Sequence, residues 1–339
     1  MRHFVSAGIL VIVVAILAYA GINASGLALH QNPVVASTQA VSIDGLWHAE
    51  VVVLSFLFAL IVGPILYSLV AFRRRKGDTT DGVHMEGNAS LEIGWTVAPL
   101  ILVVVFAYWG SYSLGEVRRV DPNAMVVNVR ASQWVWVFEY PNTGILSEEL
   151  HLPVGRQVVL KMQSADVIHS FWVPEFRIKQ DVVPGRTTEY RVTPSLIGDF
   201  KVRCAELCGT DHYKMERPVI VSSQEDYDAW IAEQTLIAAE KAKTPEGQGQ
   251  ILTVQNGCIG CHSVDGGIGR GPTWFGLYGE EVPLNDGTTV IADDAYIIES
   301  IHNPNAKIVE GFPSPSIMPV FELTDEQIAN IIAYIKTLH

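Results

Sequence analysis

The four cysteines of the chain stand in two pairs, and each pair lies beside residues that bind metals. In the second pair, Cys258 and Cys261 are followed directly by His262. Two thiols three positions apart can each add to a vinyl group of haem, and the adjacent imidazole can then bind the iron. A redox dithiol and half of a zinc site are the alternatives, but zinc needs a second ligand pair and residues 245–339 hold no other cysteine. The spacing therefore predicts a covalently attached haem.

The second axial ligand of that haem follows by elimination. Of the six methionines only Met318 lies after residue 245, and a thioether ligand would raise the reduction potential of the iron. His302 is the rival ligand. Pro272 stands ten residues after His262, where its carbonyl could accept the imidazole N–H that the iron leaves free, as metal-bound histidines usually require. A proline there is equally compatible with plain turn chemistry.

The first pair, Cys204 and Cys208, lies in a twelve-residue run that also holds Glu206, His212 and Met215. Thiolates, an imidazole and a weak thioether are the ligand types of blue-copper sites. A blue site uses one cysteine, so the second cysteine favours two thiolates that bridge a pair of copper ions.

Each copper ion of such a pair would need its own histidine, and the run supplies only one. His169 is the best candidate for the second histidine, and His151 is a weaker one. A short disulfide between the two cysteines is the alternative to copper in an exported domain.

Three apolar stretches without charge indicate membrane segments in a chain that is 49% hydrophobic and 17% charged. They cover residues 4–22, 51–72 and 95–114, and about 20 helical residues cross the roughly 30 Å hydrocarbon core. The second and third are predicted to span. The first is predicted to be a cleaved signal peptide, because Ala18 and Ala20 precede Gly21 as in a small-residue cleavage site; a retained third span is the alternative.

Charge beside the spans predicts their orientation. Four basic residues, 73–76, directly follow the second apolar stretch, and positive charge beside a span stays in the cytoplasm. Everything after about residue 115 is therefore predicted to lie outside. The net charge of −13 disfavours a nucleic-acid partner.

The exported part changes character once. Residues 123–222 contain short β-rich runs separated by turn residues, which predicts a β-sandwich or barrel of about 100 residues. Residues 224–243 are predicted to be helical, and residues 244–247 are predicted to form a linker. The rest is predicted to be a small domain with a short opening helix, a Gly-rich loop and a closing helix, which begins with a capping box at Thr324 and Gln327.

The two spans, the aromatic run at residues 133–140 and the cysteine run at 204–215 together resemble subunit II of cytochrome c oxidase, in the form with a fused C-terminal cytochrome c. The resemblance implies a transmembrane helical hairpin (49–114) and an all-β cupredoxin-like Greek-key domain (120–222). A helical linker (223–244) and an all-α class I cytochrome c domain (245–339) would follow. Residues 1–22 would be the signal peptide or an extra helix.

The same resemblance implies a set of site residues. The dicopper (CuA) ligands would be the side chains of His169, Cys204, Cys208, His212 and Met215 and the backbone carbonyl of Glu206. The Glu206 carboxylate would reach a magnesium ion shared with subunit I. Trp134 would receive electrons, although on the bare sequence it is as readily a packed strand aromatic. Haem c would be held by Cys258, Cys261, His262 and Met318. Quinol-oxidase relatives lack these copper ligands, so quinol is disfavoured as the donor.

The predicted function is electron input to a respiratory cytochrome c oxidase in a bacterial plasma membrane, with the copper and cytochrome domains outside. Electrons would pass from haem c to the dicopper centre and on to subunit I, which reduces oxygen and translocates protons. The alternatives are the same module in a nitric oxide reductase, or a membrane-tethered electron carrier. The electron-carrier alternative is disfavoured by Glu92, which lies in a segment that resembles the family's proton-uptake site. Glu92 could also be an ordinary interfacial carboxylate.

The predicted partners are the other oxidase subunits, membrane lipid and a soluble or membrane cytochrome c or other electron donor. Residues 245–339 carry twelve acidic and three basic side chains. A surface this acidic would attract a basic donor, or it would merely keep an exported domain soluble.

Overall fold

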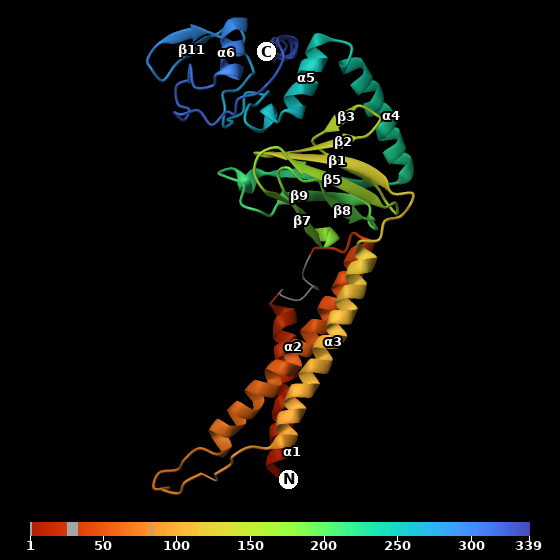
Figure 1. The fold of residues 1–339 in the computed structure, drawn as a ribbon, viewed down its shortest axis with the longest axis vertical. Coiled ribbons are helices and arrows are strands. Elements are labelled where there is room, and N and C mark those ends of the chain that lie inside the picture. The colour runs from red at the N-terminus through yellow and green to blue at the C-terminus, as the bar shows by residue number, and fades with distance from the viewer. Residues whose placement is uncertain (1, 26–32, 83) are drawn as a thin grey trace. The chain divides into compact units, whose positions relative to one another are not determined.

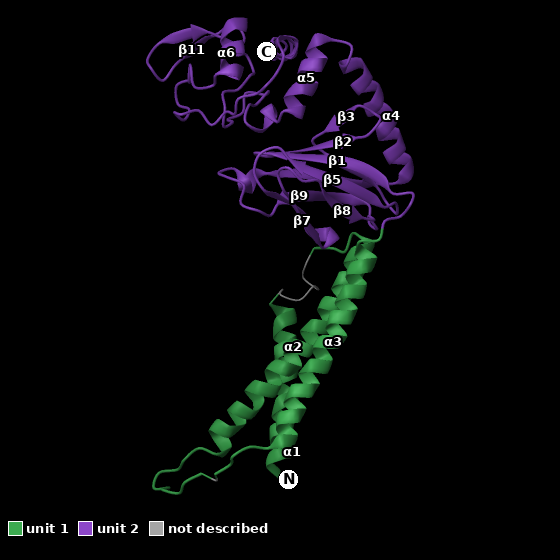
Figure 2. Cartoon of the chain, in the orientation of Figure 1, with its two compact units in different colours: residues 1–119 green, residues 120–339 purple. Residues whose placement is uncertain are grey.

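The computed structural model describes residues 2–25, 33–82 and 84–339 (Figure 1). These residues form two compact units, 1–119 and 120–339 (Figure 2), and each unit is described by itself.

The first unit consists of three helices: α1 (Arg2–Ala24), α2 (Thr38–Ala71) and α3 (Ala89–Val117). All three are long and apolar enough to cross a membrane. Each covers one of the predicted apolar stretches, except that α2 ends one residue before Phe72. The first and second pack together, since a Cβ placed on Gly63 would lie 2.8 Å from the Val11 side chain. Cleavage of residues 1–22, of which Met1 lies outside the described residues, stays a prediction.

Polar residues define where the two long helices begin. The Ser37 hydroxyl accepts the backbone N–H of Ala40 at the start of α2. The Asn88 side chain accepts the backbone N–H of Leu91 at the start of α3. Both caps satisfy an N–H that the helix itself cannot pair. The spans therefore begin several residues before the apolar stretches that mark them in the sequence.

The second unit begins with a sandwich of two five-stranded sheets, which is called the copper domain after the metal predicted to bind it. One sheet has the order β3-β2-β1-β5-β8 and the other has the order β4-β10-β9-β6-β7. The strands are β1 (Met125–Ser132), β2 (Val135–Tyr140), β3 (Ile145–Ser147), β4 (Leu150–Pro153), β5 (Val158–Ser164), β6 (His169–Val173), β7 (Ile178–Val182), β8 (Thr188–Val192), β9 (Gly198–Cys204) and β10 (Glu216–Ser222).

Large apolar side chains fill the space between the sheets. Trp136, Phe171 and Tyr190 are almost fully buried, and the Trp136 and Phe171 rings meet edge to face with centroids 5.4 Å apart. Residues 125–140, which form one β-rich aromatic run in the sequence, fold as a hairpin, because Gln133 and Trp134 turn the chain between β1 and β2. Several short strands, among them β6 and β10, were not predicted.

The linker helix α4 (Gln224–Lys241) packs against the sandwich at β3 and β4. Its Trp230 ring stacks on His151 of β4 at 3.9 Å between centroids and meets Tyr140 at 5.0 Å. The Ser223 hydroxyl caps its first turn. The linker is therefore a docked helix rather than a loose tether.

The C-terminal cytochrome domain contains α5 (Pro245–Gln255), α6 (Asp294–His302) and α7 (Asp325–Ile335). The predicted capping box of Thr324 and Gln327 is present at the start of α7. The first and last of these helices cross closely, since a Cβ placed on Gly249 would lie 1.9 Å from the Asn330 carbonyl oxygen. A small hairpin of β11 (Glu281–Pro283) and β12 (Thr289–Ile291) adds two strands to a domain predicted to be helical.

Candidate metal centres

The two-cysteine run forms a loop between two paired strands. Cys204 ends β9, and a one-turn helix at His212–Lys214 leads into β10. The Cys204 N–H donates to the Met215 carbonyl at 3.0 Å, and the Ala205 N–H donates to the Ser170 carbonyl at 2.9 Å. These bonds fix both ends of the loop beside the start of β6, which carries His169.

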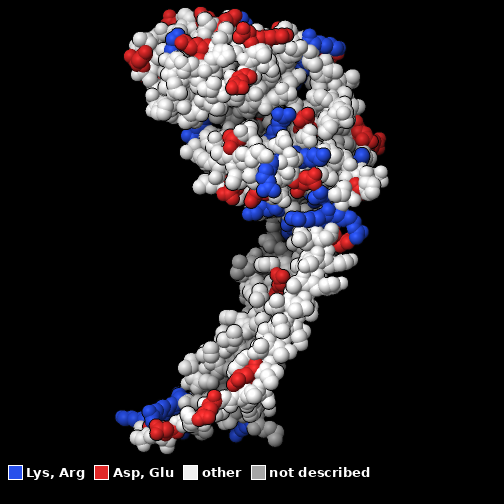
Figure 3. Space-filling model, in the orientation of Figure 1, with Lys and Arg blue, Asp and Glu red and all other residues white. Residues whose placement is uncertain are grey.

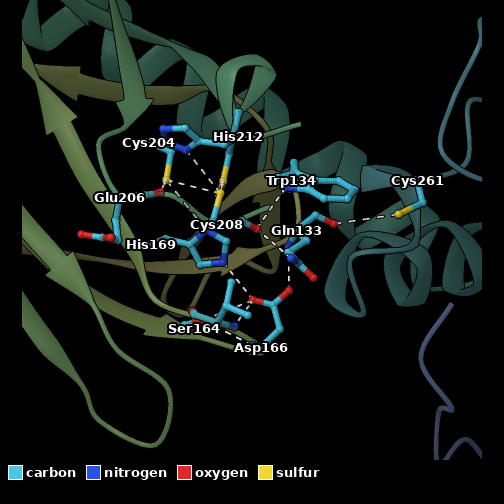
Figure 4. A network of polar contacts seen from close by, with 12 residues as sticks. Gln133, Trp134, Ser164, Asp166, His169, Cys204, Glu206, Cys208, His212 and Cys261 are labelled. Carbon is cyan, nitrogen blue, oxygen red and sulfur yellow. Dashed lines mark hydrogen bonds and ion pairs between the residues drawn. The ribbon is translucent and has the colours of Figure 1, made fainter. Parts of the chain in front are cut away.

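The predicted copper ligands converge in this loop (Figure 4). The two cysteine Sγ atoms are 3.7 Å apart, well beyond the roughly 2.05 Å of a disulfide, so the structure does not support the disulfide alternative. The other ligand atoms lie within 4 Å of a cysteine sulfur: His169 Nδ1 at 3.9 Å and the Glu206 carbonyl oxygen at 3.2 Å from Cys204, and His212 Nδ1 at 3.5 Å and Met215 Sδ at 3.8 Å from Cys208.

The electrostatics of the two thiols fit a cationic occupant. Burial disfavours the thiolate at both positions, but hydrogen bonds from His169 and the backbone lower the pKa of Cys204 to about 6. Burial together with the neighbouring Cys204 charge raises the pKa of Cys208 to about 12. Two adjacent thiolates therefore need positive charge between them, which metal ions supply because a coordinated thiol is deprotonated.

A carboxylate orients the buried histidine. His169 Nε2 lies 2.8 Å from Asp166 Oδ1, and Asp166 Oδ2 accepts the Gln133 backbone N–H at 2.7 Å. Burial alone would lower the pKa of His169, but the bond to Asp166 outweighs it and the pKa is raised. This partner directs Nδ1 of His169 toward Cys204 and is the kind of support that metal-bound histidines have.

Three further donors, two in the β1–β2 turn and one in β2, bond to the carbonyls of the loop. Gln133 Nε2 and Trp134 Nε1 both donate to the Cys208 carbonyl, at 2.7 and 3.2 Å. Trp136 Nε1 donates to the Met215 carbonyl at 3.4 Å. Trp134 is only 9% exposed, so the tryptophan predicted to receive electrons is covered rather than open to solvent.

The weaker histidine candidates lie elsewhere. His151 is engaged with Trp230 of the linker helix and with Glu149, and it does not belong to the cysteine–histidine cluster of the described residues. His302 is exposed at the end of α6. The structure thus brings the preferred copper ligands together and places His151 apart from them.

The haem-binding motif forms a tight turn in the cytochrome domain. Cys258–Gly260 is a single 3-10 turn, and His262 follows it. His262 Nδ1 lies 2.7 Å from the Pro272 carbonyl oxygen, as predicted, and the ring stacks on Trp274 at 4.8 Å between centroids. This bond leaves Nε2 available for a metal, and burial lowers the pKa of His262, which favours the neutral, metal-binding form.

The donor set of this domain fits a haem. A Cβ placed on Gly271 would lie 2.6 Å from Cε1 of His262, so the chain leaves room around the imidazole that a larger residue would fill. Cys258 and Met318 both pack against the same apolar core, which includes Trp274. A thiol, an imidazole and a thioether thus border one apolar region of a single small domain.

Glu92 has a local structural role in the first unit. Its Oε1 accepts the Asn88 backbone N–H at 3.2 Å, while Asn88 caps the same helix. The carboxylate therefore closes the first turn of α3. Its predicted part in proton uptake remains a prediction.

Two functional contacts were missed in the sequence. Asp166 stands three residues before His169, and a carboxylate so close to a histidine ligand is a usable signal. Gln133 gives no such signal, because an amide side chain alone does not indicate a partner in a loop more than 70 residues away. Its contact with the Cys208 carbonyl depends on the folded position of the β1–β2 turn beside the loop.

Three family models match successive parts of the chain. Residues 24–114 match "Cytochrome C oxidase subunit II, transmembrane domain", and residues 145–224 match the periplasmic domain of the same subunit. Residues 247–339 match "Cytochrome c". The order of these matches agrees with the order of the domains described above.

Relatives match over most of the chain. Cytochrome c oxidase subunit 2 of Alkalihalophilus pseudofirmus is 32% identical over 86% of this chain and 87% of its own length. The protein of the same name from Synechocystis sp. is 35% identical over 59% of this chain and 74% of its own length. The crystal structure of the periplasmic domain of subunit II of cytochrome oxidase from Bradyrhizobium japonicum is 27% identical over 35% of this chain and 96% of that chain, with a TM-score of 0.32.

The helices, the copper-type loop and the haem-type turn define a membrane-anchored electron-transfer protein with two metal centres. The chain belongs to the cytochrome c oxidase subunit II family and carries a C-terminal cytochrome c domain. The predicted fold class is confirmed, and membership implies copper in the sandwich and haem in the C-terminal domain.

Proposed function

We propose that the chain is the electron-input subunit of a respiratory cytochrome c oxidase. It would pass electrons from haem c to a binuclear copper centre and on to subunit I, where oxygen is reduced to water and protons are translocated. The observation that carries this proposal is the convergence of two thiols, two imidazoles and a thioether, four of them from the cysteine loop and the fifth, His169, from β6. That donor set suits copper electron transfer and offers no position for substrate chemistry.

The proposed copper ligands are the side chains of His169, Cys204, Cys208, His212 and Met215 and the carbonyl of Glu206. The Glu206 carbonyl faces the Cys204 sulfur, while its carboxylate is exposed and points away from the cysteines (Figure 4). This division supports a second role for the carboxylate as a magnesium ligand shared with subunit I.

The proposed haem ligands are Cys258 and Cys261 through thioether bonds and His262 and Met318 through the iron. When bound, the haem and the copper pair would each accept and release one electron at a time. The protein's part is to hold both groups, exclude water and fix their potentials. The bond from His262 to the Pro272 carbonyl and the bond from His169 to Asp166 serve that purpose by fixing each imidazole.

The proposed domain boundaries follow from the same assignment: membrane hairpin 49–114, copper domain 120–222, linker 223–244 and cytochrome domain 245–339. We place the chain in a bacterial plasma membrane as a multi-pass protein in contact with lipid, with both metal domains outside. The basic residues 73–76 after the apolar part of α2 support this orientation.

Turnover of the purified complex tests the function directly. The complex should reduce oxygen with electrons from a reduced cytochrome and should turn over nitric oxide poorly. Faster turnover of nitric oxide than of oxygen would assign the chain to a reductase instead.

Proton uptake near Glu92 is a separate part of the proposal. Glu92→Gln should slow oxygen turnover while leaving the reduction of haem c by the donor unchanged. Because Glu92 also caps α3, Asn88→Ala is the matched control, since it weakens the same helix start without removing a carboxylate. Equal turnover in Glu92→Gln and the unmodified complex would leave Glu92 as a cap only.

A further inference from the structure

The two metal-bearing domains of the second unit meet at two turns. Cys261 Sγ of the haem-binding turn lies 4.0 Å from the Gln133 carbonyl oxygen of the β1–β2 turn (Figure 4). A Cβ placed on Gly260 would lie 2.9 Å from that oxygen and 3.0 Å from the Trp134 backbone nitrogen. Both neighbours are backbone atoms, which cannot rotate away. The contact therefore requires glycine at this position of the haem-binding turn.

An ion pair bridges the same two domains beside this contact. Arg270 of the cytochrome domain donates two hydrogen bonds to the carboxylate of Asp211, which lies in the cysteine loop at 204–215 (the copper loop). Nε lies 2.5 Å from Oδ2, and Nη2 lies 2.7 Å from Oδ1. Its guanidinium also lies over the Trp134 ring, 5.8 Å from the centroid. A bidentate pair of this kind fixes orientation as well as distance.

The charge pattern of the cytochrome domain makes this arginine distinctive. Among the three basic residues of 245–339, Lys307 pairs with Glu299 and Lys336 pairs with Asp294, and both partners lie in the same domain. Arg270 is the only arginine there, and it forms its ion pair with Asp211 of the copper domain. In an otherwise acidic domain the one guanidinium is thus placed on the copper-domain face.

We propose that Arg270 and Asp211 are positioning residues that hold the haem-binding turn against Gln133 and Trp134. The chain's own cytochrome domain would thereby occupy the face of the copper domain where Trp134 receives electrons, and a soluble donor would reduce the cytochrome domain instead. This inference rests on the proposed function, because it assigns the two turns to the transfer between haem and copper.

The same residues connect the contact to the copper loop. The Gln133 side chain and the Trp134 indole both donate to the Cys208 carbonyl, and Asp211 directly precedes His212. A shift of the cytochrome domain would therefore separate the haem-bearing thiol from the residues bonded to the copper loop. A cavity of about 320 Å³ beside Arg270, lined from both domains, leaves that side chain 39% exposed, so salt can reach the ion pair.

The glycine contact gives the sharpest test. Gly260→Ala adds one methyl group against the Gln133 backbone, and Gly267→Ala is the matched control because its Cβ would meet chiefly the flexible Asp265 side chain at 3.0 Å. In the full chain within its purified complex, hydrogen exchange at the amides of residues 133–136 and 257–262 should rise in the first variant only. Electron transfer from photoreduced haem to copper should slow in the first variant only, because the added methyl group pushes the haem-binding turn away from the β1–β2 turn.

The ion pair is tested in parallel. Arg270→Gln should raise the same exchange rates and slow the same transfer, while Lys336→Gln should change both by less than about twofold, as surface substitutions usually do. The control removes a cation that also pairs with an aspartate and lies over an aromatic ring, but within one domain. The swapped pair Arg270→Asp with Asp211→Arg should recover much of the loss. Raising salt on the unmodified complex should act in the same direction as Arg270→Gln.

The outcomes separate this inference from the proposed function. Unchanged exchange and transfer in both Gly260→Ala and Arg270→Gln, with intact haem and copper spectra, would overturn the positioning role and leave the proposed function standing. An unmodified complex that shows no transfer from haem to copper would overturn the proposed function. If hydrogen exchange rises in both variants while the rate of electron transfer from haem to copper is unchanged, the two turns touch but their contact does not control the transfer. That result would also overturn the inference.

Discussion

The copper domain takes its proposed ligands from a sheet strand and a loop that are far apart in the sequence. The cytochrome domain, by contrast, carries three of its four proposed haem ligands on one short turn. His169 lies at the start of β6 and the cysteine loop follows β9, and backbone bonds hold them together. Met318, by contrast, lies in a segment without helix or strand. A scaffold positions the copper ligands, while the haem itself would have to organise much of its own site.

The two domains also differ in charge. Residues 120–222 carry twelve acidic and eleven basic side chains, a net charge of −1, and residues 245–339 carry twelve and three, a net charge of −9. Figure 3 shows acidic side chains on the cytochrome domain and a mixture of both signs on the sandwich. The comparison suggests different tasks for the two domains. The sandwich holds its ligands in place without the metal. The cytochrome domain depends on its cofactor for order, and its acidic surface can attract a charged partner.

Loss of haem attachment should have the largest effect on this contrast. The double variant Cys258→Ser with Cys261→Ser should lose all covalent haem and leave residues 245–339 open to proteolysis, while the sandwich stays resistant. Haem staining of a denaturing gel and limited proteolysis measure both results. Cys204→Ser with Cys208→Ser is the matched control, which should keep a stained band at the mass of the chain. A colourless band from the unmodified, cofactor-loaded chain would refute the haem assignment itself.

Removal of one bridging thiol should abolish the copper signal without unfolding the sandwich. Two bridging thiolates would share one unpaired electron between two copper ions, so the intact domain should give a seven-line paramagnetic resonance pattern. Cys208→Ser should eliminate it, and Cys261→Ser should not. Circular dichroism should show the β-sheet unchanged in both. A four-line spectrum from the unmodified domain would indicate a single copper ion instead.

The charge contrast predicts a moderate kinetic effect. Reduction of the cytochrome domain by a basic donor should slow by about tenfold as salt rises from about 10 to 200 mM, where the screening length falls from roughly 30 Å to below 10 Å. An uncharged small reductant is the control and should show little dependence. A flat rate with the basic donor would leave the acidic surface as a solubility feature.

The smallest effect concerns pH and the linker helix. Burial against Trp230 lowers the pKa of His151, the neighbouring Glu149 only partly opposing this. The neutral ring is therefore favoured in the folded state, and its contribution to stability is complete above the ordinary pKa of about 6.5 and declines as pH falls below it. His151→Phe keeps a stacked ring and should flatten the loss of sandwich stability between about pH 7 and 5. An unchanged pH dependence in thermal unfolding would exclude His151 as its source.

The sequence predicted most of what is local. The haem turn, the partner carbonyl of Pro272 and the capping box of α7 each depend on residues within about ten positions, where turn and helix geometry constrain the chain. The apolar stretches were found for the same reason, because length and hydrophobicity alone define a span.

What the sequence could not supply depends on contacts between distant segments. Short strands such as β3 and β6 carry too few residues to show a period, and their pairing is decided by the sandwich. The covering of Trp134 follows from a glycine and an arginine more than 100 residues away, at positions 260 and 270. Gln133 and Asp211 acquire their roles only through that contact.

The docked linker helix changes how electron supply should scale with the amount of donor. Helix α4 packs on the sandwich through Trp230 and leads directly into α5. The cytochrome domain therefore stays attached to the copper domain. Under the proposed function, only the reduction of the cytochrome domain is second order. The transfer that follows is first order, and its rate should be the same in a cell poor in soluble cytochrome as in one rich in it.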